Sequence, residues 1–192
     1  MNPTMTLHLE FERALYAAFP RLPLPPVAAM APDSSLARHA RELLDGTPWP
    51  EAVGYRLLYG EMDISLGGWM QSMPPGVFDY YLASHLMLAS ILVEQGGRMN
   101  YVGQVMEAFL LPPPGATADA VAELDDELVP DASVASYGAV RLDFYHRTAP
   151  DRRACIGQFL DLYLRHRGAN EFSPRGVALF ERNRDYWLHS SR

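Results

Sequence analysis

The side chains best suited to catalysis lie in one short run, Asp79-Tyr-Tyr-Leu-Ala-Ser-His85. His85 follows Tyr81 by four residues, and residues four apart share one side of a helix. A buried histidine beside a tyrosine can act as a general base or can bind a small polar ligand. A histidine in an apolar helix more often makes a single hydrogen bond in the core. Both interpretations stay open, and they make Tyr81 and His85 the candidate pocket residues.

Patterns that bind metal ions are sparse. His39 and Glu42 are three residues apart, on one face of an expected helix. A zinc or iron site needs three or four ligands, and the chain has no H-E-x-x-H or C-x-x-C motif to supply the others. We therefore expect no metal site and no cofactor.

Composition excludes several classes of enzyme. All 16 basic residues are arginines, so the chain cannot form a lysine Schiff base or a phosphate-binding loop that ends in Gly-Lys. Cys155 is the only cysteine, and its apolar helical surroundings favour a buried thiol over a nucleophile. No G-x-S-x-G or G-x-G-x-x-G motif occurs. We expect no catalytic residue.

The charge distribution favours a basic protein partner. A net charge of −7 disfavours nonspecific binding to nucleic acid or to an anionic membrane. Residues 117–131 hold six acidic side chains and no basic one. Within them, the candidate partner-binding residues are Glu123, Asp125, Asp126 and Glu127. The alternative is that this stretch is a solvated segment that keeps the protein soluble.

Neither the N-terminal residues nor the longest apolar run indicates an association with a membrane. The N-terminal residues lack the basic and apolar regions of a signal peptide. The longest apolar run, residues 80–93, is interrupted by Ser84 and His85 and is shorter than the roughly 20 residues that cross a bilayer. We therefore expect a cytoplasmic protein.

The spacing of apolar residues predicts a mostly α-helical fold with little or no strand. We expect one compact domain over residues 1–192, with about seven or eight helices. The segment 74–94 is apolar on most sides, as in a buried central helix, and Gly96 and Gly97 should end it. A shorter helix should follow over residues 100–111.

The two ends of the chain also show helical spacing. Residues 7, 11, 15 and 19 form an apolar face of a first helix, which Thr6 should cap and Pro20 should stop. Thr148 and Asp151 predict a capping-box start for a helix that closes at Gly168. Residues 140–145 should dock just before it. A last helix should begin at Pro174 and bury its Trp187.

Four motifs occur in order along the chain: Ala17-Ala-Phe-Pro-Arg-Leu-Pro-Leu-Pro25, Phe78-Asp-Tyr-Tyr-Leu82, Arg152-Arg-Ala-Cys-Ile-Gly-Gln-Phe-Leu160, and Tyr186-Trp187. Together they resemble a family of bacterial proteins that share a domain of unknown function. Ala83 and Ser84 stand where that family often has Pro-Ala. The resemblance spans nearly the whole chain and implies a helical fold and a bacterial source. It carries no active-site residue to this chain.

These observations lead to two hypotheses. The first is a non-catalytic cytoplasmic binding protein, of the immunity or regulatory type, whose partner is a basic protein. Tyr80 and Tyr81 face different sides of one helix, which predicts that one of them is exposed to such a partner. The alternative is a small-molecule enzyme or ligand-binding domain with a pocket around Tyr81 and His85. A polar pocket at His85 would favour the alternative, and a flat acidic and aromatic face would favour the first.

Overall fold

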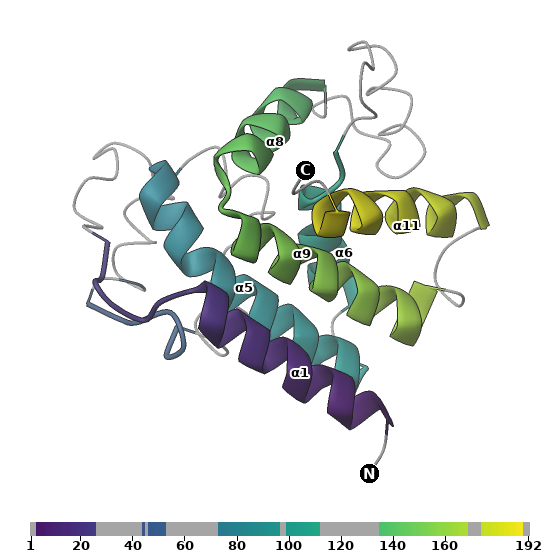
Figure 1. Cartoon of the computed structure of the whole chain (residues 1–192), viewed down its shortest axis with the longest axis horizontal. Helices are drawn as coiled ribbons and strands as arrows, with labels where there is room; N and C mark the ends of the chain where they lie inside the picture. Colours follow the sequence, from purple (N-terminus) through teal and green to yellow (C-terminus); the bar gives the residue numbers. More distant parts are fainter. Residues whose placement is uncertain are drawn as a thin grey trace. The chain divides into compact units, whose positions relative to one another are not determined.

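The protein is mostly α-helical in the part of the chain that the structure describes. The structure, a computed structural model, describes residues 3–25, 44, 46–52, 73–96, 99–111, 135–168 and 174–189. These residues form six α-helices and no strand, which confirms the prediction of a mostly α fold (Figure 1). The helices are α1 (Pro3–Ala18), α5 (Pro75–Gln95), α6 (Met99–Ala108), α8 (Ala135–Arg147), α9 (Pro150–Tyr163) and α11 (Pro174–His189), and a π-helical turn, η2 (Leu164–Gly168), extends α9.

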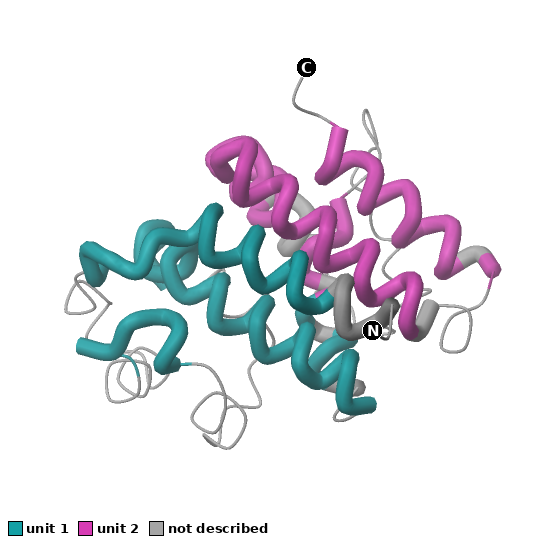
Figure 2. Tube along the Cα trace, turned by 60° about the horizontal axis from the view of Figure 1, so that its bottom comes forward, with its two compact units in different colours: residues 1–105 teal, residues 106–192 magenta. Residues whose placement is uncertain are grey.

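Contacts within the chain divide it into two compact units, residues 1–105 and 106–192 (Figure 2). The first unit holds α1, α5 and most of α6, and the second holds α8, α9 and α11. Each unit has its own buried side chains. The single domain over residues 1–192 stays a prediction.

In the first unit, α1 lies along α5 (Figure 1). Phe11, Leu15 and Phe19 are buried, which confirms the expected apolar face at these three positions, whereas the side chain of Leu7 lies outside those described. The helix begins at Pro3, so the prediction that Thr6 caps it is wrong. Proline is favoured in the first turn because its missing N–H would have no helical partner there.

The helix α5 matches its predicted range to within one residue. Every residue from Tyr80 to Ser90 is buried, and Gly96 ends the helix in the left-handed conformation, with φ of 70° and its N–H bonded to the Leu92 carbonyl. Glycine adopts this conformation at no steric cost. The prediction for α6 was too long, because this helix ends at Ala108 rather than at Leu111.

By length and composition, α5 is a candidate membrane span. The expectation that its apolar run is too short was wrong, because the helix continues beyond residues 80–93 at both ends. In its most apolar window, 78% of the residues are buried inside the structure. Such burial is typical of a core helix.

In the second unit, residues 140–145 lie inside α8 and do not merely dock before the next helix. Thr148 also differs from its predicted role. Its hydroxyl donates to the Phe144 carbonyl at 2.5 Å, and Ala149 is the N-cap of α9, with no side-chain cap bond. Threonine often bonds back to the carbonyl four residues earlier. Here that bond closes α8, so the capping box predicted with Asp151 does not form.

The α9–α11 pair is the main packing contact of the second unit. Cys155, Phe159 and Tyr163 lie four residues apart along α9 and are all buried, and the burial of Cys155 confirms its prediction as a buried thiol. Gly157 faces Leu188 so closely that a Cβ there would lie 2.7 Å from the Leu188 Cγ and 3.1 Å from its backbone nitrogen. The two helices therefore need glycine at position 157 to approach this closely.

Trp187 is buried, as predicted, at 1% exposure. Its indole N–H donates to the Phe109 carbonyl at 2.9 Å. Its ring packs edge-on against Phe109 and Tyr145, with centroids 5.9 and 4.9 Å away. Two residues after Phe109, the Leu111 N–H donates to Asn183 Oδ1 at 2.7 Å. The helix α11 is thus hydrogen-bonded to residues 109–111, which follow α6.

Candidate functional site

Tyr81 serves the packing of the first unit. Its side chain is 1% exposed, and its hydroxyl lies 2.7 Å from the Leu44 carbonyl oxygen and 2.8 Å from that of Thr47. Both carbonyls flank Gly46, which has a φ of 68°. A buried carbonyl without a hydrogen-bond donor is costly. Tyr81 therefore stabilises this turn against α5.

Two neighbouring side chains of α5, Tyr80 and Ser84, likewise bond the backbone around Trp49. Tyr80 donates to the Arg21 carbonyl at 2.5 Å and accepts the Trp49 N–H at 3.3 Å. Ser84 donates to the Trp49 carbonyl at 2.8 Å. The Trp49 indole N–H donates in turn to the Phe19 carbonyl at 3.1 Å. These bonds attach the segments on both sides of the 26–43 interval to one helix.

Tyr80 and Tyr81 are therefore both buried, at 9% and 1% exposure, and the expectation that one of them is exposed was wrong. Their rings pack edge-on with centroids 4.9 Å apart, and both hydroxyls bond backbone atoms of the segments that cover α5. The roles of Ser84 and Trp49 were not predicted from the sequence. The available signal was the clustering of polar groups at positions 80, 81, 84 and 85 in an otherwise apolar helix.

His85 pairs with Tyr101 of α6. The His85 Nδ1 lies 2.7 Å from the Tyr101 hydroxyl, and the two rings stack with centroids 6.2 Å apart. Burial lowers the pKa of His85 to about 4 and raises the pKa of Tyr101. Both groups are therefore uncharged at neutral pH. The structure brings His85 to Tyr101, and it directs the polar atom of Tyr81 to a different place, the turn at Gly46.

We expect His85 to make folding stability depend on pH. The folded-state pKa of about 4 lies below the ordinary value of 6.5, so the unfolded chain binds the proton more readily between these two values. The stability that the neutral His85 contributes is complete above the pKa of the unfolded chain and is lost as the pH falls toward 4. Between pH 7 and pH 5 the free energy of unfolding should fall by about 2 kcal/mol through this group. Urea unfolding at the two pH values measures it.

The variant His85→Asn tests this assignment, because asparagine keeps a polar atom near the Nδ1 position and does not titrate. It should flatten the stability profile between pH 7 and pH 5. The matched control is His189→Asn, since His189 is exposed, and this variant should keep the wild-type slope. An unchanged slope in His85→Asn would contradict the assignment.

Cys155 is buried, at 1% exposure. Burial, and to a smaller extent the Asp151 carboxylate, raise the pKa of its thiol to about 12. The thiolate is the nucleophilic form of cysteine. At neutral pH the Cys155 side chain is therefore a protonated apolar group, in agreement with the predicted buried thiol.

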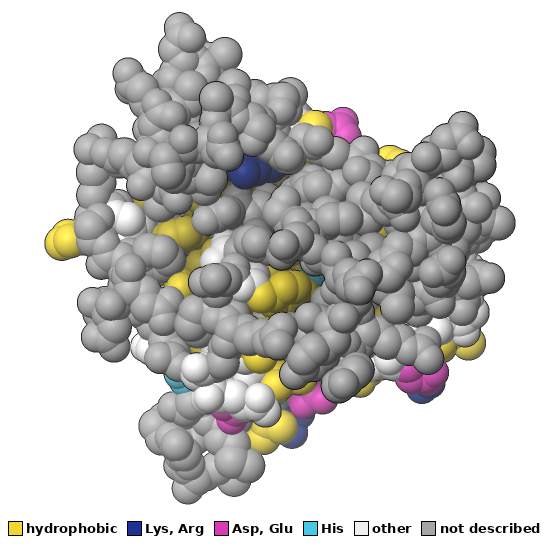
Figure 3. Space-filling model, turned by 180° about the vertical axis from the view of Figure 1, so that it is seen from behind, with side chains coloured by type: hydrophobic (Ala, Val, Ile, Leu, Met, Phe, Trp, Pro, Cys, Tyr) yellow, Lys and Arg dark blue, Asp and Glu magenta, His cyan; other side chains and the backbone are white. Residues whose placement is uncertain are grey.

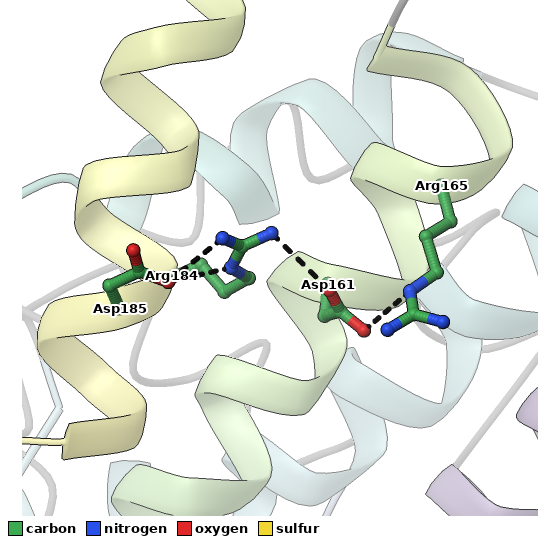
Figure 4. Close-up of polar contacts among 4 residues, drawn as sticks. All are labelled: Asp161, Arg165, Arg184 and Asp185. Atoms are coloured by element: carbon green, nitrogen blue, oxygen red, sulfur yellow. Dashed lines mark hydrogen bonds and ion pairs between the residues drawn. The ribbon is translucent and has the colours of Figure 1, made fainter.

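Charged groups of α9, η2 and α11 meet, as Figure 4 shows. Arg165 and Arg184 approach Asp161 from its two sides, with N–O distances of 2.8 and 3.4 Å (Figure 4). Arg184 also pairs with Asp185 at 2.8 Å. The two guanidinium groups face two carboxylates, so this cluster is electrically balanced. It links α9 to α11 and offers no excess charge to a ligand.

Comparisons with protein-family models, with curated proteins and with solved structures find no match for this chain. The resemblance to a bacterial family therefore stays a prediction.

The predicted partner-binding residues, Glu123, Asp125, Asp126 and Glu127, lie outside the described residues. His39 and Glu42 also lie outside them. Among the residues that are described, no three His, Cys, Asp or Glu side chains group closely enough to hold a metal ion.

We expect protein purified without added metal to contain no bound transition metal. His39 and Glu42 supply two ligands at most, and stable sites use three or four. Elemental analysis of the purified protein measures this. Stoichiometric zinc or iron would contradict the prediction and would favour an enzyme.

Proposed function

We propose that the protein is a non-catalytic binding module whose partner is a basic protein. The main support is that the three candidate reactive side chains, Tyr81, His85 and Cys155, have structural roles in the fold. Tyr81 bonds backbone carbonyls, His85 bonds Tyr101, and Cys155 is a buried protonated thiol. Each of these groups is occupied in packing. In this proposal the charge of the surface acts on the partner.

That charge is unevenly distributed along the sequence. The chain carries a net charge of −7, and residues 117–131 contribute six acidic side chains without a basic one. On the face drawn in Figure 3, described acidic and basic side chains form separate small spots rather than one field. An acidic segment increases the rate at which a basic partner associates.

We propose further that this protein is bacterial and cytoplasmic and of the immunity or regulatory type, and the family resemblance supports the bacterial source. It also includes the finer description of the fold, in which about seven or eight helices surround α5. The burial of α5 from Tyr80 to Ser90 supports this arrangement.

The alternative, a small-molecule site at Tyr81 and His85, has less support. A ligand there would have to displace the bond between His85 and Tyr101 and the bond between Tyr81 and the 44–47 turn. Each displaced bond would leave a buried polar group to be satisfied by the ligand.

The test compares two variants that lose the same charge at different places. In the first variant, Glu123, Asp125, Asp126 and Glu127 become Gln or Asn. In the control, four exposed acidic residues of the described helices change in the same way: Glu10, Glu94, Asp143 and Glu181. The partner is captured on immobilised wild-type protein, purified and identified, and its binding kinetics are then measured at several salt concentrations.

We expect the captured partner to be basic. The first variant should lower its association rate constant by about tenfold and flatten the salt dependence, with little change in dissociation rate or stability. The control should change the association rate much less. Equal effects of the two variants would show that only the overall charge matters. Unchanged kinetics in both would overturn the proposed role of the acidic stretch.

A further inference from the structure

We draw no further inference here: the strongest candidate, the exposed apolar surface formed by Leu9 and Tyr16 of α1 with Leu22 just beyond it, carries no proposal because its exposed neighbours Glu10, Arg13, Arg21 and Glu51 balance in charge and nothing in the structure shows what covers it.

Discussion

Replacing Trp187 with alanine should lower the free energy of unfolding by about 3–5 kcal/mol, the usual cost of truncating a buried tryptophan. The side chain is 1% exposed and packs against Phe109, Phe144 and Tyr145. The substitution leaves a cavity between these rings and removes the donor to the Phe109 carbonyl. Urea unfolding followed by circular dichroism measures the loss.

Two further variants separate the sources of this effect. Trp187→Phe keeps an aromatic ring but removes the indole N–H, so part of the loss, about 1–3 kcal/mol, should remain. Tyr16→Ala truncates an aromatic ring that is 50% exposed and should cost much less. If Trp187→Ala unfolds at the same urea concentration as wild type, the C-terminal helix is not docked as described.

Gly157→Ala should destabilise the protein toward the upper end of the range of about 1–3 kcal/mol that is typical of overpacked positions. The new Cβ would lie 2.7 Å from the Leu188 Cγ and 3.1 Å from the Leu188 backbone nitrogen. A side chain can rotate away, but a helix backbone cannot. The substitution must therefore push α9 and α11 apart.

Gly103→Ala is the matched control for this substitution. Both glycines lie inside helices, and a Cβ at position 103 has no neighbour within 4 Å. Alanine is the better helix former by about 1 kcal/mol, so this variant should be more stable than wild type. The two variants should therefore change the free energy of unfolding in opposite directions. A stabilised Gly157→Ala would contradict the close approach of α9 and α11.

Local and periodic features of this chain could be predicted from the sequence. The ends of α5 followed from Pro74, Pro75 and Gly96, because proline and glycine restrict or permit particular backbone angles at the residue itself. The burial of Phe11, Leu15 and Trp187 followed from helical spacing, because one face of a helix must leave water. The burial of Cys155 also followed from its apolar neighbours along one helix.

Choices between equivalent local partners depended on the tertiary structure. Thr148 could cap the helix after it or bond back to the helix before it, and its bond to the Phe144 carbonyl selected the second. The sequence predicted that either Tyr80 or Tyr81 is exposed. In the structure the Tyr80 hydroxyl bonds the carbonyl of Arg21 and the N–H of Trp49, so Tyr80 is buried as well.

The candidate site depended on the tertiary structure for the same reason. Sequence spacing placed Tyr81 and His85 on one side of a helix but carried no information about the residues opposite them. Tyr81 meets a turn 34–37 residues away, and His85 meets Tyr101 on the next helix. Hydrogen-bond partners so distant along the chain are set by the three-dimensional packing of the segments, and here that packing gives both side chains a structural role.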